Sequence, residues 1–192
     1  EASRWIKARD KDKPFFLYMP FIAPHSPLEA PDDLVKKYED LEDTRELTRS
    51  AAIDRTRTLN GFSPSARPMY AAVVDGLDQA IGQVLDTLAK EGIEEETIIL
   101  FSSDNGGAAY AGGGADNFPL RGGKGDTYEG GIRVVAAMRW KGTLDAGKSF
   151  ESIMTVMDVF PTLASAAGIS MLNTKEIWGR DLWSAIQNGK NI

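Results

Sequence analysis

The segment that most constrains the fold of this chain is residues 97–107, Thr-Ile-Ile-Leu-Phe-Ser-Ser-Asp-Asn-Gly-Gly. Its first five residues are apolar or β-branched, and this length and composition predict a strand buried on both faces. In an open α/β sheet, ligands bind at the C-terminal edge of such a strand. Asp104 and Asn105 follow the strand and offer the oxygen ligands that Ca²⁺ or Mg²⁺ prefers, whereas an ordinary Asp-Asn-Gly turn is the alternative. The segment therefore predicts either a metal site or a simple turn at a sheet edge.

The charge and cysteine content argue against several classes of function. The chain of 192 residues carries 22 Lys and Arg against 28 Asp and Glu, a formal net charge of −6. A chain this acidic is not expected to be a general binder of nucleic acid or of anionic membrane surfaces. It contains no cysteine, which excludes disulfides and thiolate metal sites within the chain. No apolar run in the sequence reaches the length of a membrane span.

Periodicity and helix-ending residues predict alternating strands and helices. Apolar runs predict three strands, at residues 15–21, 97–102 and 132–140. Helical spacing predicts three helices, at residues 32–39, 68–91 and 158–167. The longest is bounded by Pro68, which suits a first helical turn, and by Gly92, which ends helices. The pattern predicts one α/β domain over residues 1–192, with a mostly parallel sheet and helices on both faces.

Two basic side chains are candidates for the same sheet edge. His25 is the single histidine, in a proline-bounded loop after the predicted strand at residues 15–21. An imidazole there can bind an anion or donate a proton to a leaving group, although a packed or solvated loop residue is the alternative. Lys124 follows the Asp-Asn pair in a glycine-rich loop and can hold a tetrahedral anion, or can be a solvated surface lysine. Gly125 stands where a P-loop requires Ser or Thr, which argues against a nucleotide site.

Several segments resemble the sulfatase family of the alkaline-phosphatase-like superfamily. They occur in the family's order and cover most of the chain: FFLYMPFIAPHSP (15–27), YAAVVDGLDQAIGQVLDTL (70–88), IILFSSDNGG (98–107), LRGGKGDTYEGGIRV (120–134) and MDVFPTLASAAG (157–168). SDNGG followed by LRGGKGxxYEGGIR is specific as a pair, whereas each half alone would be weaker. The resemblance implies an alkaline-phosphatase-like α/β fold and a calcium-dependent hydrolase of sulfate monoesters, of the arylsulfatase type.

The resemblance also implies roles for the four candidate residues. Asp104 and Asn105 match the family's metal ligands for Ca²⁺, with Mg²⁺ as the alternative ion. Lys124 matches the lysine that contacts the substrate sulfate, and His25 matches the histidine on the ester or leaving-group side. The implied substrate is a sulfate-ester small molecule or a sulfated glycan. From family habit alone, we expect a periplasmic or secreted location.

The family's nucleophile is absent from the sequence. Sulfatases use a formylglycine made from Cys or Ser in a C/S-x-P-x-R motif, and Phe62-Ser-Pro-Ser-Ala-Arg67 fits this motif in neither register. We expect the chain to be the C-terminal portion of a sulfatase catalytic domain, with an incomplete sheet and with formylglycine in a missing N-terminal segment. Because covalent chemistry needs its nucleophile, the isolated chain should be inactive.

Other partners and functions stay open at this point. The open edge of a partial sheet should favour self-association or binding of a complementing N-terminal half. One alternative function is a non-catalytic, sulfatase-like module that binds a partner or an anion. Another is a phosphatase or phosphonate hydrolase of the same superfamily, although one histidine is too few for a two-metal centre.

Overall fold

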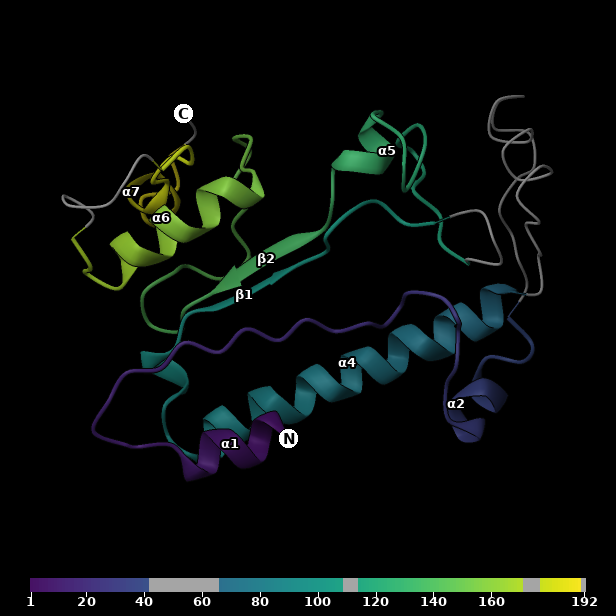
Figure 1. Cartoon of the computed structure of the whole chain (residues 1–192), viewed down its shortest axis with the longest axis horizontal. Helices are drawn as coiled ribbons and strands as arrows, with labels where there is room; N and C mark the ends of the chain where they lie inside the picture. Colours follow the sequence, from purple (N-terminus) through teal and green to yellow (C-terminus); the bar gives the residue numbers. More distant parts are fainter. Residues whose placement is uncertain (42–65, 109–113, 171–176, 191–192) are drawn as a thin grey trace. The chain divides into compact units, whose positions relative to one another are not determined.

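The computed structural model of the chain describes residues 1–41, 66–108, 114–170 and 177–190 (Figure 1). The chain forms two compact units. The first unit comprises Glu1–Glu94 with Ile99–Met138, and the second comprises Glu95–Ile98 with Arg139–Ile192. Within the described ranges, no helix combines the length and the apolar character that a bilayer crossing requires.

The longest helix of the first unit, α4 (Ala66–Lys90), confirms the prediction for residues 68–91. Its buried apolar residues are Ala72, Val73 and Leu88. The helix is followed by Gly92, whose φ of +71° lies in the left-handed region that glycine adopts without a steric penalty. Helical spacing in the sequence was therefore sufficient to predict both the helix and its end.

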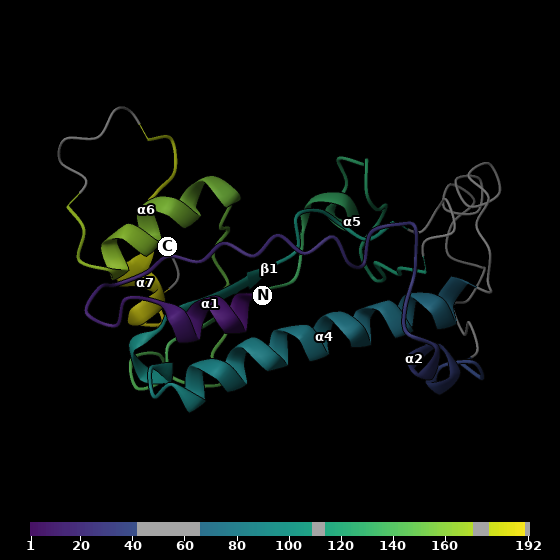
Figure 2. The same cartoon turned by 60° about the horizontal axis from the view of Figure 1, so that its bottom comes forward.

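Two short helices pack against α4 near its opposite ends, as Figures 1 and 2 both show. They are α1 (Ala2–Ala8) and α2 (Asp32–Lys37), and α2 confirms a predicted helix. Asp75 of α4 accepts hydrogen bonds from Lys37 Nζ (2.6 Å) and from Tyr38 Oη (3.1 Å). The bond from Lys37 is the main reason that the pKa of Asp75 lies below its ordinary value. These bonds fasten α2 to the long helix.

The sheet of the described residues has two strands, which lie side by side in Figure 1. Strand β1 (Ile99–Ser102) follows the 3₁₀ turn η1 (Glu94–Glu96), and strand β2 (Ala136–Arg139) comes later in the chain. Both lie inside strands that the sequence predicted, although each is shorter than expected. The prediction that β1 is buried on both faces is wrong, because Phe101 is 40% exposed. The described residues supply no layer that covers both sides of this strand.

The two strands run antiparallel, in contrast to the expected mostly parallel sheet. Beyond the strand ends, Ser103 N donates to Val135 O (3.1 Å) and Gly106 N donates to Gly131 O (2.9 Å), so pairing advances along one segment as it recedes along the other. A parallel pair needs a long crossover, usually a helix. Here the described part of the connection consists of glycine-rich loops and the four-residue helix α5 (Glu129–Ile132). This connection suits antiparallel neighbours.

The prediction of a strand at residues 15–21 is wrong, because this segment joins no sheet within the described residues. Its burial nevertheless alternates as in a strand. The half-buried side chains are Phe15, Leu17 and Met19. The side chains between them face solvent, with Phe16 79% and Tyr18 76% exposed. The period of two is present, but no backbone hydrogen bond joins the segment to a described strand.

Helix α6 (Val156–Ala166) of the second unit confirms the predicted helix at residues 158–167, and its buried face combines polar with apolar residues. Asp158 and Thr162, one turn apart, are both buried. Three large apolar residues of the helix are exposed, namely Val156 (85%), Met157 (54%) and Phe160 (61%), whereas Val159 and Leu163 are half-buried. Apolar spacing located this helix correctly but gave no sign that Asp158 and Thr162 would be buried.

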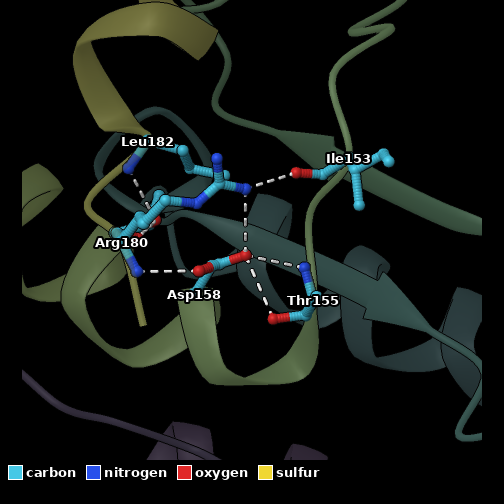
Figure 3. Close-up of polar contacts among 6 residues, drawn as sticks. Ile153, Thr155, Asp158, Arg180 and Leu182 are labelled. Atoms are coloured by element: carbon cyan, nitrogen blue, oxygen red, sulfur yellow. Dashed lines mark hydrogen bonds and ion pairs between the residues drawn. The ribbon is translucent and has the colours of Figure 1, made fainter. Parts of the chain in front are cut away.

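The buried polar face of α6 binds the backbone of a later segment, as Figure 3 shows. The Asp158 carboxylate accepts hydrogen bonds from Thr155 N (2.8 Å) and from Arg180 N (2.7 Å). Thr162 Oγ1 accepts a hydrogen bond from Leu182 N (3.0 Å). The bond to Thr162 satisfies a buried backbone donor, because Leu182 is buried, and the two bonds to Asp158 are part-buried.

A close backbone contact also joins α6 to the segment that leads to α7 (Trp183–Gln187). Pro161 lies inside α6 and has no N–H, so it gives no hydrogen bond to the carbonyl of Met157 one turn earlier. Gly179 lies against this carbonyl, and a Cβ atom on Gly179 would be 1.8 Å from Met157 O. The contact therefore requires glycine at position 179.

Candidate functional site

The loop that follows β1 carries the Asp104-Asn105 pair. Asp104 Oδ1 accepts a hydrogen bond from Asn105 N (2.9 Å), and Asn105 Nδ2 donates to Gly106 O (2.9 Å). Ser103 Oγ donates to Asn105 O (2.9 Å). Within the described residues, the second oxygen of Asp104 and the amide oxygen of Asn105 make no hydrogen bond. The loop is thus fixed by its own bonds and presents one charged and one neutral side-chain oxygen.

Glycines from three neighbouring segments pack backbone against backbone beside this pair. A Cβ atom on Gly106 would lie 1.7 Å from Gly130 O, and one on Gly130 would lie 2.3 Å from Gly122 O. A Cβ atom on Gly131 would lie 2.1 Å from Asp126 O. Such distances leave no room for a side chain. Gly106, Gly130 and Gly131 therefore serve close packing, which distinguishes them from glycines of an ordinary flexible loop.

The backbone N–H and C=O of Gly107 join the Asp104-Asn105 loop to the loop of Lys124. Gly107 N donates to Asn117 Oδ1 (2.8 Å), and Asn117 Nδ2 donates back to Gly107 O (2.8 Å). Lys124 N donates to the same carbonyl oxygen (3.2 Å). Gly107 comes two residues after Asn105, so this junction brings the Asp104-Asn105 pair and Lys124 into one region.

The residues on either side of Lys124 make hydrogen bonds and ring contacts within their own loop. Gly123 N donates to Asp126 Oδ2 (2.9 Å), and the Arg121 guanidinium lies over the Tyr128 ring, 3.7 Å from its centroid. Lys124 itself is half-buried, and its ammonium makes no hydrogen bond or ion pair within the described part of the chain. A lysine in this position carries a positive charge that no described carboxylate neutralises by direct contact.

His25 lies in an exposed turn of the same unit. Its backbone N–H donates to Ile22 O (2.8 Å), and its ring Nδ1 lies 2.6 Å from Ser26 O. Because a carbonyl oxygen can only accept, this contact assigns the proton to Nδ1 and leaves Nε2 as the second ring nitrogen. Within the described residues, no hydrogen bond or ion pair joins His25 to the other three candidate residues. The structure thus connects three of the four predicted site residues through Gly107 and places His25 on a separate turn.

The donor chemistry of the Asp-Asn pair fits part of a calcium site. A carboxylate and an amide oxygen are both hard ligands, and calcium takes six to eight such oxygens. The described residues contain no group of three or more His, Asp or Glu side chains that could hold a metal ion. Among the described residues, the pair could therefore supply two oxygens of a coordination sphere.

Asn117 is the main site residue to which the sequence analysis gave no role. Its neighbours Asp116 and Phe118 are exposed, whereas Asn117 is half-buried. An amide side chain carries one donor group and one acceptor, the same complement as a peptide group. An Asn within a glycine-packed loop is therefore a signal for a side chain that clamps a peptide.

The segment Phe62–Arg67, which failed as a nucleophile motif, lies outside the described residues as far as position 65. Its arginine is described, and Arg67 Nη1 donates to Gly114 O (2.6 Å). Gly114 is buried and immediately precedes the part of the loop that contains Asn117. Arg67 thus fastens this loop to the start of α4.

Comparisons with known proteins agree with the resemblance seen in the motifs. The family model described as Sulfatase matches residues 1–169. Arylsulfatase J of Mus musculus is 34% identical over 184 residues, which cover 96% of this chain and 27% of the relative. N-acetylgalactosamine-6-sulfatase of Canis lupus familiaris is 31% identical over 193 residues, which cover 99% of this chain and 32% of the relative.

Solved structures agree as well. The crystal structure of Ps i-CgsB in complex with k-i-k-neocarrahexaose matches with a TM-score of 0.81 at 32% identity, covering 99% of this chain and 37% of that one. The structure of the sulfatase yidJ from Bacteroides fragilis, at 24% identity and a TM-score of 0.78, supports the fold alone. The fold is part of the alkaline-phosphatase-like sulfatase fold, and the chain spans between 27% and 37% of the length of the relatives named first. By sequence and by fold, the chain belongs to the sulfatase family.

Proposed function

We propose that this chain forms the metal-binding and sulfate-binding side of a sulfate monoester hydrolase of the arylsulfatase type. The observation that carries the proposal is the Gly107 junction, where Lys124 N donates to the carbonyl oxygen next to the Asp104-Asn105 loop. Two hard oxygen ligands and an ammonium group are the components needed to surround a sulfate anion. The motifs of both loops match those of the family.

Asp104 and Asn105 would hold the divalent cation, with Ca²⁺ favoured over Mg²⁺. Calcium accommodates an irregular set of oxygens at longer distances, whereas Mg²⁺ demands near-ideal octahedral geometry. A bound cation would neutralise charge on the sulfate oxygens. The remaining ligands must come from groups other than the described His, Asp and Glu side chains of this chain.

Lys124 would bind a sulfate oxygen, because its ammonium has no carboxylate partner within the described residues. As the imidazolium, protonated at both ring nitrogens, His25 would donate a proton from Nε2 to the oxygen of the departing alcohol and be left as the neutral ring with its proton on Nδ1. Its Nδ1 contact to Ser26 O supports this role, since it fixes the ring and directs the other nitrogen elsewhere.

The isolated chain should bind without turning over substrate. Its sequence offers no Cys and no serine in the C/S-x-P-x-R pattern from which formylglycine is made. Attack on sulfur needs this nucleophile, and electrostatic stabilisation alone does not replace it. Activity therefore requires a formylglycine segment in addition to the 192 residues.

The substrate class is the sulfate ester of a small molecule or of a glycan. Among the relatives, one is named N-acetylgalactosamine-6-sulfatase and another was solved with k-i-k-neocarrahexaose. A third is named Steryl-sulfatase, so the family's substrates differ widely. The exposed Phe118 and Tyr128 lie on the loop that carries Lys124 and are candidates for contact with the alcohol portion.

The test compares p-nitrophenyl sulfate hydrolysis by the 192-residue chain with that by an enzyme that joins this sequence to a formylglycine segment. The chain alone should show no turnover. In the enzyme, Lys124→Ala should lower kcat/KM by about 100-fold or more. Lys148→Ala, at an exposed position of the second unit, is the matched control and should leave kcat/KM unchanged. Equal effects of the two substitutions would overturn the assignment of Lys124.

Two other functions make different predictions in the same assay. A non-catalytic module would bind sulfate in the joined enzyme but would hydrolyse no ester. A phosphatase or phosphonate hydrolase would prefer p-nitrophenyl phosphate over the sulfate. The single histidine of the chain argues against the latter, because two-metal phosphatase centres draw on several histidines.

We also propose that each unit binds further protein through its exposed apolar side chains. In the first unit, Phe16, Tyr18 and Ile22 are more than three-quarters exposed. In the second unit, Val156 and Trp178 are similarly exposed. Monomeric proteins rarely leave such surfaces uncovered, so either a complementing N-terminal half or a second copy should cover them. Light scattering should show association of the isolated chain, and a strict monomer at all concentrations would contradict this.

A further inference from the structure

We propose that Asn117 is a positioning residue that sets the Lys124 ammonium at its distance from the Asp104-Asn105 pair. This inference rests on the proposed function, because it concerns the same anion and metal site. Asn117 does not belong to the set of groups expected to touch metal or sulfate. Its side chain acts on Gly107, the residue at which the two loops meet.

The orientation of the Asn117 amide is determined by its partner. Gly107 N can only donate and Gly107 O can only accept, so Oδ1 must face the N–H and Nδ2 must face the carbonyl. Both bonds are 2.8 Å long. Two bonds from one planar side-chain amide to the N–H and the C=O of a single residue fix position and rotation together, which a single bond does not.

The carbonyl oxygen of Gly107 accepts twice. One hydrogen bond comes from Asn117 Nδ2 (2.8 Å) and the other comes from Lys124 N (3.2 Å). Because a carbonyl oxygen has two lone pairs, these two bonds use its acceptor capacity. A shift of the Gly107 peptide therefore moves the backbone of Lys124 and the end of the Asp-Asn loop together.

The surroundings of the junction prevent another arrangement. A Cβ atom on Gly123 would lie 2.7 Å from Gly107 O and 2.8 Å from Asn117 Nδ2. A Cβ atom on Gly107 would lie 2.5 Å from the Ala115 Cβ. Ala115 and Gly123 are buried, so water has little access from their side to replace the Asn117 amide. The clamp depends on the asparagine itself.

Two substitutions separate the clamp from simple packing. Asn117→Ala removes both hydrogen bonds. Asn117→Asp has nearly the same shape and keeps the acceptor for Gly107 N, but it places a carboxylate oxygen against Gly107 O. Asn188→Ala is the matched control, because Asn188 is exposed in the other unit and donates to Ser184 O at the end of α7.

The first readout is independent of activity and uses amide hydrogen exchange of the 192-residue chain. Asn117→Ala should lose protection at Gly107, whereas Asn117→Asp, which keeps the acceptor for Gly107 N, should lose less of it. Gly106, whose N–H donates to Gly131 O (2.9 Å), should retain its protection and serves as the internal reference. If Gly107 keeps its protection in Asn117→Ala, the clamp does not exist and the inference is overturned.

The second readout uses the enzyme that joins this sequence to a formylglycine segment. Mispositioning of Lys124 should lower kcat about 10- to 100-fold, since small displacements of a charged group have effects of this size. It should also raise the inhibition constant of inorganic sulfate, by about tenfold. A loss of folded protein would lower the maximal rate alone, so an unchanged sulfate constant in Asn117→Asp would overturn the positioning role.

The outcomes also distinguish this inference from the proposed function. Wild-type enzyme without sulfate-ester turnover would refute the proposed function and the positioning role that rests on it. The exchange data would then still decide whether Asn117 holds Gly107. Turnover that is normal in Asn117→Ala and Asn117→Asp would refute the positioning role alone.

Discussion

Asp158 and Arg180 are 22 residues apart in the sequence, yet the carboxylate of Asp158 accepts a 2.7 Å hydrogen bond from the backbone N–H of Arg180 (Figure 3). This bond is the first cause that holds the pKa of Asp158 below its ordinary value of 3.8, and the bond from Thr155 N is the second. The Arg180 guanidinium, 3.8 Å from the carboxylate, adds a weaker attraction. A buried carboxylate is therefore kept ionised by backbone donors more than by its ion pair.

Asp158→Asn should lower the free energy of unfolding of the second unit by about 1–3 kcal/mol, because one buried donor loses its acceptor. Urea unfolding followed by tryptophan fluorescence measures this, since Trp140, Trp178 and Trp183 belong to that unit. Asp145→Asn changes an exposed carboxylate of the same unit and should alter the free energy by less than about 0.5 kcal/mol. Equal losses in both variants would contradict the role of Asp158.

The low pKa of Asp158 also predicts the direction of the pH dependence. A carboxylate with a depressed pKa stabilises the folded state above its unfolded-state pKa, and this contribution is lost as the pH falls through the folded-state pKa. The wild-type chain should therefore lose stability as the pH is lowered below about 4. The gap between wild type and Asp158→Asn should narrow over the same range. A gap that stays constant down to acid unfolding would show that Asp158 is not the titrating group.

Gly106→Ala should destabilise the first unit by at least about 2 kcal/mol, because the new methyl group would overlap Gly130 O. Gly82→Ala in α4 has open space around its Cβ position and provides the matched control. It should stabilise the helix by about 0.5–1 kcal/mol, since alanine is the better helix former. Thermal unfolding measured by circular dichroism compares the two. Effects of the same sign would refute the packing argument.

The Asn105-Gly106 bond should resist deamidation. In this reaction the backbone nitrogen of the following glycine attacks the side-chain amide carbon and ammonia leaves, so the nitrogen must be able to move. Gly106 is buried and its N–H donates to Gly131 O at 2.9 Å, whereas Asn188 and Gly189 form an exposed Asn-Gly pair.

Peptide mass spectrometry of the folded chain, incubated at mildly alkaline pH, should show acid formation at Asn188 before Asn105. In denaturant the two sites should react at similar rates, which is the control for intrinsic reactivity. Similar rates in the folded chain would show that the glycine packing does not protect Asn105. A third pair, Asn60-Gly61, lies outside the described residues.

The isolated chain should bind Ca²⁺ weakly, with a dissociation constant of about millimolar or above. Asp104 and Asn105 offer two oxygens where calcium takes six to eight. Titration calorimetry with CaCl₂ should give little heat, and Asp104→Asn should abolish what remains. Tight, stoichiometric binding by the 192-residue chain would contradict the proposal that it supplies part of a coordination sphere.

The sequence predicted those elements whose stability comes from local spacing. Helix α4 shows this best, because its apolar stripe and Gly92 define it without reference to the rest of the fold. The segment at residues 15–21 shows the opposite case. Its period of two is visible in the sequence, but a strand forms only when a neighbouring strand hydrogen-bonds to it, and the sequence of the segment alone does not determine that pairing. The direction of β1 and β2 was missed for the same reason.

The candidate site divides in a similar way. Asp104, Asn105 and Lys124 were identified because their side chains have a chemistry of their own, and family motifs reinforced it. Asn117 was missed because its importance comes from two hydrogen bonds to a peptide that lies ten residues earlier. Contacts of this kind depend on how two loops pack together, and neither the periodicity nor the composition of the sequence predicts that packing.

The carbonyl of Met157 links two positions that a reader of the sequence would treat as unrelated. Proline at 161 withholds the donor that this carbonyl would have within its own helix, and glycine at 179 occupies the space in front of it. In a protein with a residue other than proline at 161, the N–H of that residue can donate to the carbonyl of residue 157. Position 179 then no longer needs to be glycine. Across the evolution of sulfatases, these two positions should therefore covary, so that replacement of the proline at 161 accompanies replacement of the glycine at 179.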